Sequence, residues 1–362
     1  MRVLVLVLVL ALVLPRAALG LEFDPSSWMN ATRDRALGAL TLPGSHDSAT
    51  QYLSPKLQPG RAGQLPRWVD DAVRLAESIG VPADQLVRRW ARAQSARVGA
   101  QLRLGARYVD LRSGWDGDEG VWRCHHALEG QAVDEILEEV KVFLVEQPSE
   151  VVIVELSHFY GDPSESAVER LATAATEIFG DMLAPYPGDA RAALYDAQLG
   201  KDYVDVNHRA IVVFEDANVG KRFKLWPRET LTNTYADSDD ARAMAAFNRD
   251  VVAAFNEKSF RDDALLKLSW TLTPQASTVV RSLNIFEKNP KSLLELASSR
   301  ANPPLRDFAA DAALHACSLA HIVVVDDFDH SSVVDVVLAS NVHGMFPKGA
   351  CAWSAAALAS ER

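Results

Sequence analysis

Residues 132–160 read AVDEILEEVKVFLVEQPSEVVIVELSHFY, and this stretch decides the fold class. Its first half repeats apolar residues at the spacing of one helix face, namely Val133, Ile136, Leu137, Val140, Phe143 and Leu144. Pro148 ends this helix because its nitrogen has no hydrogen to donate. The continuous apolar run Val151 to Leu156 then predicts a strand buried on both faces, as the strands of parallel sheets are.

Further apolar runs of similar length predict further buried strands, at Tyr108 to Leu111, Ile211 to Phe214, Leu265 to Trp270 and Ile322 to Val325. Helical patterns lie between these runs, and this repeated order favours an α/β fold with a parallel sheet or a closed barrel. Residues 54–99 differ, because they are rich in Pro, Arg and Ala and hold no strand pattern. We expect a single domain over residues 21–362, with residues 54–99 inserted as helices over the barrel mouth.

Residues 1–20 have the pattern of a signal peptide. Arg2 precedes an apolar run from Val3 to Leu14, and Ala18 and Gly20 supply the small side chains that signal peptidase requires. The run is shorter than the roughly 20 residues that span a bilayer, and an uncleaved anchor is the alternative. We therefore expect a secreted or lumenal protein with no stable membrane insertion, since no later stretch of the sequence is apolar over that length.

The charge of the chain limits its partners. A net charge of -11 argues against nucleic acid as the main ligand and against tight electrostatic adsorption on an anionic membrane. The sequon Asn30-Ala31-Thr32 lies just past the signal segment and makes Asn30 a candidate site for an N-glycan in a eukaryotic host.

The cysteines indicate no metal site. Cys124, Cys317 and Cys351 are an odd count for an oxidising compartment, which permits one disulfide with one thiol left over. The pair Cys317 with Cys351 is preferred, and Cys124 is expected to be a small buried apolar residue. The spacing of the three residues does not match that of metal-binding cysteines.

Charged residues recur beside the predicted strands. In Leu42-Pro43-Gly44-Ser45-His46-Asp47-Ser48, a His and an Asp follow a predicted Pro-Gly turn and can project into a cavity. Asp110 and Arg112 are two residues apart, so strand alternation places both side chains on one face. His125-His126 precede the amphipathic helix, and Asp326-Asp327 follow the last strand. Singly these are ordinary structural residues, but their convergence on one barrel mouth predicts an active site.

These segments together resemble a known family. The ordered set GSHDS (44–48), YVDLR (108–112), the histidine pair, EQPSEVVIVELSHFY (146–160), Trp226-Pro227 and VVVDDF (323–328) is similar to the X domain of phosphatidylinositol-specific phospholipases C. The likeness covers most of the chain beyond the signal segment and is greatest to the small bacterial enzymes and the animal proteins that have only an X domain. It implies a distorted TIM-type (β/α) barrel.

The resemblance also implies catalytic roles. His46 resembles the general base that removes the proton from the inositol 2-hydroxyl, and Asp327 resembles the carboxylate that orients this base. His126 resembles the general acid that protonates the departing diacylglycerol oxygen, with the adjacent His125 as the alternative. Asp47 resembles the acidic partner that tunes this acid.

Arg112 resembles the arginine that neutralises charge on the phosphorane, and Asp110 resembles its neighbour. Arg112 stands where calcium-dependent relatives carry an acidic ligand, and Leu156 stands where they carry another, with Glu155 one residue away. The resemblance therefore implies catalysis without a metal ion or another cofactor. On physical grounds alone, displacement at phosphorus requires a base, an acid and a cation at the equatorial oxygens.

A second group of residues is predicted to contact the substrate, namely His125, Ser157, His158 and Trp226. For His158 a structural hydrogen bond is an equally good interpretation. Glu215 and Asp216 lie where bacterial relatives place an arginine of the inositol pocket, and this departure leaves the headgroup open.

Three functions are compatible with this sequence. The first is a phospholipase C that acts on a phosphatidylinositol-type lipid at a membrane surface and releases diacylglycerol and cyclic inositol phosphate. The second is a phosphodiesterase of the glycerophosphodiesterase or sphingomyelinase D kind, which requires the acidic metal ligands that Asp110-Leu111-Arg112 does not supply. The third is a catalytically silent barrel that binds a lipid headgroup or a protein.

Overall fold

The computed structural model describes residues 24–56, 74, 80, 82–257, 264–284, 286–316 and 318–341. The predicted signal peptide and the preferred pair Cys317 with Cys351 lie outside the described residues. Cys124 is a buried free cysteine, as the sequence predicts, and its burial raises the pKa of its thiol far above the usual range. Asn30 of the sequon is exposed.

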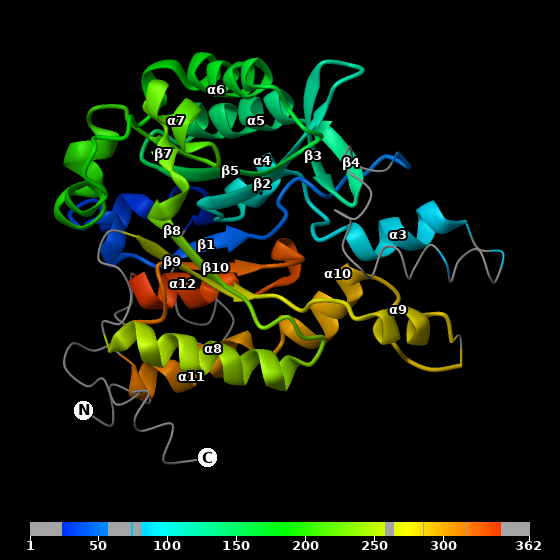
Figure 1. Ribbon diagram of the computed structural model, residues 1–362. Coiled ribbons are helices and arrows are strands. Elements are labelled where there is room, and N and C mark those ends of the chain that lie inside the picture. Colours follow the sequence, from blue (N-terminus) through cyan, green and yellow to red (C-terminus); the bar gives the residue numbers. More distant parts are fainter. Residues whose placement is uncertain are drawn as a thin grey trace.

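One curled sheet organises the described part of the chain (Figure 1). Parallel strands pair in the order β7-β6-β5-β2-β1-β10-β9-β8, and the hairpin β3–β4 joins β2 in antiparallel fashion. The strands are β1 (Leu42–Ser45), β2 (Tyr108–Asp116), β3 (Val121–His126), β4 (Leu128–Ala132), β5 (Val152–Tyr160), β6 (Ala210–Phe214), β7 (Trp226–Pro227), β8 (Leu231–Thr234), β9 (Leu265–Trp270) and β10 (Ile322–Val325). This arrangement confirms the expected α/β fold with a distorted TIM-type barrel.

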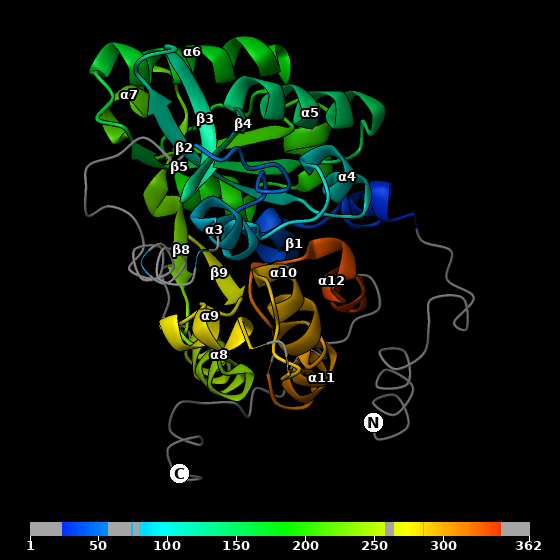
Figure 2. The same cartoon turned by 90° about the vertical axis from the view of Figure 1, so that its right-hand side faces the viewer.

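Helices surround this sheet, and Figure 1 shows α5 and α6 on one side of it with α8, α11 and α12 on the other. The helices are α3 (Ala83–Ala91), α4 (Val98–Arg103), α5 (Val133–Glu146), α6 (Glu165–Phe179), α7 (Ala217–Arg222), α8 (Ala241–Asn256), α9 (Ala276–Ser282), α10 (Leu293–Leu296), α11 (Leu305–His315) and α12 (Val333–Asn341). Figure 2 shows α3, α9 and α10 in front, at the end of the barrel where the parallel strands terminate. None of the described helices combines the length and the apolar character needed to cross a bilayer.

The elements predicted from apolar patterns are confirmed. The predicted strands are found in β2, β5, β6, β9 and β10, and the predicted helix is α5, which buries all six residues of its apolar stripe. In the described part of residues 54–99, α3 and the start of α4 are helical. The apolar pattern succeeds here because these elements bury nearly all of their apolar side chains.

The Pro-Gly segment is a strand, not the expected turn. Pro43 lies in β1, and the pairing of β1 with β2 begins at the next residue, Gly44. Pro43 has no N–H to donate, and at its position β2 offers no partner strand that would need one. A Cβ on Gly44 would lie 2.7 Å from Val324 Cγ1 and 2.9 Å from Tyr108 Cδ1. Glycine is therefore required here because the barrel interior is filled by the neighbouring strands.

A hairpin precedes α5 where the sequence analysis predicted no strand. β3 ends at His126, Ala127 adopts a positive φ of 61°, and β4 returns to Ala132. Strand alternation therefore points His125 and His126 in opposite directions. The hairpin decides which histidine of the pair faces the barrel mouth.

Candidate active site

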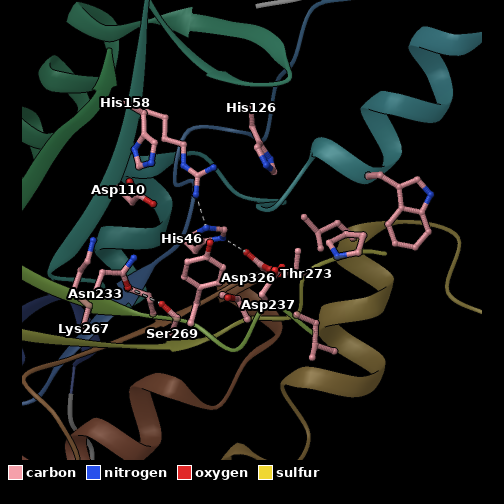
Figure 3. Close-up of a pocket in the computed structure, with 18 of the residues that line it drawn as sticks. His46, Asp110, His126, His158, Asn233, Asp237, Lys267, Ser269, Thr273 and Asp326 are labelled. Carbon is pink, nitrogen blue, oxygen red and sulfur yellow. Dashed lines mark hydrogen bonds and ion pairs between the residues drawn. The ribbon is translucent and has the colours of Figure 1, made fainter. Parts of the chain in front are cut away.

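A cavity of about 330 Å³ opens where the parallel strands end, and Figure 3 shows the side chains that surround it. Four predicted site residues line it, namely His46, Asp110, Arg112 and His126, together with His158. They lie directly after β1 and on β2, β3 and β5, strands that are spread over residues 42–160. The structure thus brings the predicted base, acid and cation to one place, as parallel strands of a barrel do.

His46 is the first residue after β1, and a carboxylate orients its ring. The His46 N–H donates to Val325 O at 3.0 Å, which ties this residue to β10. The Nδ1 of His46 lies 2.8 Å from Oδ1 of Asp326 (Figure 3). Because a carboxylate accepts, Nδ1 carries the proton and Nε2 is left to face the cavity.

The prediction that Asp327 orients His46 is wrong by one residue. Asp327 lies in the left-handed region with a φ of 50°, which turns its side chain away from Asp326. Its Oδ1 accepts from Ser95 Oγ at 2.7 Å and lies 3.1 Å from Nδ1 of His330. Two adjacent aspartates follow this strand, and only the backbone conformation decides between them.

Asp47 lies beneath the cavity and joins the proposed catalytic groups. Its Oδ1 is 2.5 Å from Arg112 Nε, and its Oδ2 is 3.4 Å from His126 Nδ1 and 3.5 Å from His46 Nε2. Burial alone raises the pKa of Asp47, but Arg112 and the two histidines outweigh it and hold this pKa far below its usual range. The residue has a φ of 44°, a conformation that Asp tolerates better than most residues.

Arg112 links the anionic and imidazole groups of the site. Besides its contact with Asp47, its Nη2 lies 2.9 Å from Nε2 of His46. A guanidinium can only donate, so Nε2 accepts in this contact and the His46 ring is neutral in it. Asp110 shares the inward face of β2 with Arg112, as alternation predicted, and its Oδ2 accepts from the Asp47 N–H at 3.3 Å.

A backbone carbonyl lies closer to the His126 ring than the Asp47 carboxylate does. The Nδ1 of His126 lies 2.7 Å from the carbonyl oxygen of Ala91, the last residue of α3. Since a carbonyl only accepts, Nδ1 carries the proton and Nε2 is the nitrogen that can exchange one. His125, the alternative acid, does not line the cavity; its Nε2 donates to His158 O at 3.1 Å, and burial lowers its pKa to about 3.

The two histidines of the cavity differ in pKa. Burial alone lowers the pKa of His46, but the carboxylates of Asp47 and Asp326 outweigh it and raise the pKa to about 9. For His126 burial dominates, so its pKa is lowered although Asp47 opposes the change. A proton added to this pair is therefore favoured on His46, where it displaces the Arg112 contact at Nε2.

The other predicted substrate contacts are only partly placed at the cavity. His158 lines it and adopts a φ of 56°, which ends the regular alternation of β5. Ser157 is buried and its Oγ lies 2.9 Å from His158 Nδ1. The prediction for Trp226 is wrong, because its indole donates to Ala184 O at 2.9 Å and packs against Tyr186, away from the cavity.

Sequence reasoning missed the polar floor of the cavity. Lys267 Nζ lies 2.5 Å from Glu155 Oε2 and donates to Tyr108 OH at 2.9 Å, all inside the barrel. Burial and Glu155 raise the pKa of Tyr108 well above its usual range. The signal was a lysine and a glutamate at inward positions of otherwise apolar strands, where an unpaired charge is costly.

A second missed group forms the wall near β8 and the loop after it. Asn233, Tyr235 and Asp237 line the cavity, and Asn233 Oδ1 accepts from Ser269 Oγ at 2.9 Å (Figure 3). Amide, hydroxyl and carboxyl groups here can pair with the hydroxyls of a sugar-like ring. No apolar strand pattern announced these residues, since β8 is short and only half buried.

The acidic groups of the cavity are a poor fit for a metal ion. Ligand atoms of His46, Asp47 and Asp110 lie within 4.8 Å of one another. Arg112 Nε already occupies the Asp47 carboxylate at 2.5 Å, and Lys267 occupies that of Glu155. A bound cation would therefore lie against a guanidinium and would have to displace it.

Comparison with known proteins defines the class. Residues 83–201 match the sequence model described as phosphatidylinositol-specific phospholipase C, X domain. Human PI-PLC X domain-containing protein 3 is 27% identical over 292 residues, which cover 78% of this chain and 84% of that protein. Mouse PI-PLC X domain-containing protein 1 is 31% identical over 214 residues, which cover 56% of this chain and 57% of that protein.

Solved structures agree with the fold. Phosphatidylinositol-specific phospholipase C from Listeria monocytogenes superposes with a TM-score of 0.56 at 15% identity, covering 88% of this chain and 99% of that one. A Staphylococcus aureus phosphatidylinositol-specific phospholipase C gives a TM-score of 0.58 at 14% identity, with coverage of 87% and 97%. The chain thus carries an X-domain sequence match on a barrel of this fold, and over most of its length it is similar to PI-PLC X domain-containing protein 3.

Proposed function

We propose that this protein is a metal-independent phospholipase C that cleaves a phosphatidylinositol-type lipid into diacylglycerol and cyclic inositol phosphate. One observation carries the proposal. Two histidines of one cavity each direct Nδ1 to a fixed acceptor, Asp326 or the Ala91 carbonyl, and an arginine lies beside them. This is the set of groups that an in-line displacement at phosphorus needs.

In the reaction, Nε2 of His46 takes the proton of the inositol 2-hydroxyl. The freed oxygen forms a bond to phosphorus while the bond from phosphorus to the glycerol oxygen breaks. His126 gives a proton to that departing oxygen, so the proton gained at one imidazole is balanced by the proton lost at the other. Asp326 stabilises the imidazolium that forms on His46.

Arg112 would change its contact when the substrate binds. Its Nη2 donates to His46 Nε2, the atom that must accept the substrate proton. The phosphodiester anion attracts the Arg112 guanidinium. When the guanidinium turns to the phosphate, it releases His46 Nε2 and places positive charge beside the oxygens that gain negative charge in the transition state. The same anion raises the pKa of His126, which moves the shared proton toward the acid.

The polar wall and floor support a polyol headgroup. Asn233, Tyr235, Asp237 and Ser269 offer both donors and acceptors at one end of the cavity. The ammonium of Lys267 is already paired with Glu155, so it adds no free positive charge for a further phosphate on the ring. The predicted signal peptide adds the proposal that the enzyme works outside the cell or in the secretory pathway.

An assay against a panel of lipids tests this function. We expect the full-length protein to release diacylglycerol from phosphatidylinositol, and His46→Ala to lose that activity. His315→Ala, on α11 away from the cavity, is the matched control and should keep it. A folded protein that binds phosphatidylinositol vesicles without turnover would instead support the catalytically silent barrel.

A further inference from the structure

Gln94 is buried behind the active site on the stretch that follows α3. Its side chain has no exposed surface, and its amide makes three hydrogen bonds to the backbone. Nε2 donates to the carbonyl oxygens of His46 at 2.7 Å and of Val325 at 3.0 Å, and Oε1 accepts from the Phe328 N–H at 3.0 Å. A backbone N–H can only donate and carbonyls can only accept, so one orientation of the amide satisfies all three bonds.

These partners belong to the two turns that carry the proposed base and its carboxylate. His46 begins the turn after β1, while Val325 and Phe328 bracket Asp326 in the turn after β10. Gln94 therefore fixes the backbone distance between the imidazole and the carboxylate. A change in that distance would change the 2.8 Å contact that orients His46.

The same stretch also holds the proposed acid. The carbonyl of Ala91 accepts from His126 Nδ1 at 2.7 Å, three residues before Gln94. At the end of this segment, the N–H groups of Ala93 and Gln94 both donate to Thr50 Oγ1, at 3.0 and 3.1 Å. The segment 91–94 is thereby anchored to Thr50, and also to Asp327, whose N–H donates to Ala93 O at 2.8 Å, and it contacts the backbone or ring of both histidines.

We infer that Gln94 is a positioning residue that aligns the base His46 and the acid His126 with each other through the segment 91–94. It does not touch the substrate cavity, so it acts only through these two groups. The catalytic meaning of the inference rests on the proposed function, whereas the alignment itself does not. No acid–base motif marks Gln94, because its partners are backbone atoms.

The substitution Gln94→Met tests the inference, since it keeps the length of the side chain and removes all three hydrogen bonds. We expect kcat to fall by roughly 10²-fold, the order of loss for a misplacement of about 1 Å, with little change in KM. The alkaline limb of the pH profile should also move, because Asp326, together with Asp47, raises the pKa of His46 and its effect depends on its distance from the ring. Loss of protein stability alone would leave that limb in place.

Gln101→Met is the matched control. Gln101 is also fully buried, and its Nε2 donates to two carbonyl oxygens, those of Ser48 at 2.8 Å and Ala96 at 2.7 Å. Gln101→Met should lower the thermal stability about as much as Gln94→Met does, and it should leave the alkaline limb of the pH profile in place. Equal kinetic effects of the two variants would overturn the inference. If Gln94→Met does not fold, the shorter Gln94→Asn, which keeps the amide and cannot reach its partners, takes its place.

A measurement without turnover separates this inference from the proposed function. In protein labelled with ¹⁵N-histidine, we expect ring nitrogen shifts of neutral His126 that report a proton on Nδ1, and a mixture of tautomers in Gln94→Met. Unchanged shifts of both His46 and His126 in the variant would overturn the positioning role. If the wild-type protein has no phospholipase C activity but the histidine shifts change in Gln94→Met, the proposed function is rejected and the positioning role of Gln94 stands.

Discussion

His46 and His126 face the same cavity, but groups of different charge hold their rings. His46 donates to the Asp326 carboxylate, and its pKa is raised to about 9, whereas His126 donates to the neutral carbonyl of Ala91 and its pKa is lowered. The first contact comes from neighbouring barrel strands, and the second comes from the helical insertion. In the proposed reaction, a barrel partner would therefore stabilise the cationic form of the base, while the segment after α3 keeps the acid ready to lose its proton.

The largest expected effect comes from removing either imidazole. His46→Ala and His126→Ala should each lower kcat on phosphatidylinositol by about 10²- to 10⁴-fold. An activated substrate with a nitrophenolate leaving group needs no acid, so it should restore much of the rate of His126→Ala and little of that of His46→Ala. Steady-state rates on both substrates make the comparison.

Equal restoration of the two variants would contradict the assigned roles, since an activated leaving group cannot replace a base. A harmless His126→Ala together with an inactive His125→Ala would move the acid to the other residue of the pair. The buried position of His125 and its bond to His158 O argue against that outcome.

The arginine between the two histidines gives the next largest effect. Arg112→Gln should reduce kcat by about 10²- to 10³-fold, as the loss of one preorganised donor to a developing oxyanion does. Arg103→Gln, which removes an exposed ion pair with Glu146, is the control and should change the rate little. A rise in KM with kcat unchanged would mean that Arg112 binds the substrate and the transition state equally well.

A smaller effect should separate the two adjacent aspartates. In the wild-type protein, kcat/KM should fall on the alkaline side near pH 9, where the proton shared by the histidine pair is lost. Asp326→Asn removes a carboxylate that raises the pKa of His46, so this limb should move to lower pH, with a rate loss of about 10- to 100-fold. The pH profiles of kcat/KM for the wild-type protein and Asp326→Asn show whether the alkaline limb moves to lower pH.

Asp327→Asn is the matched comparison for that variant. Its carboxylate contacts Ser95 and His330 rather than His46, so the alkaline limb should stay in place. A shift in Asp327→Asn and none in Asp326→Asn would restore the assignment that the sequence alone suggested.

The sequence predicted the parts of this molecule that depend on apolar burial. The strands around Tyr108, Val152 and Leu265 and the helix α5 follow from continuous or periodic apolar runs. β1 was missed because Pro43 and Gly44 usually mark turns, and only the crowded barrel interior makes them a strand. Tertiary packing therefore overrode local preference at the strand that carries the base.

The site was predictable in composition and not in its fine contacts. The residue types and their order identified His46, Arg112 and His126, because several charged residues beside strands converge at one mouth. The choice between Asp326 and Asp327 depends on a left-handed backbone conformation, which short sequence patterns do not specify. The carbonyl of Ala91 could not be foreseen, because every residue has such a group.

The smallest expected effect is that of metal removal, which should leave the activity unchanged. Arg112 Nε lies 2.5 Å from the Asp47 carboxylate and Lys267 is paired with Glu155, so in the proposed reaction side chains and not a metal ion supply the positive charge. The assay should present the lipid in micelles of a neutral detergent, since calcium also binds anionic vesicles and would alter the access of the enzyme. Rates with chelator, and with calcium added back, should agree within about twofold, well under the tenfold change that about 1.4 kcal/mol of transition-state stabilisation gives. A loss in chelator that calcium restores would show that a cation reaches His46, Asp47 and Asp110 despite the guanidinium, and the two histidines would then act beside a metal ion.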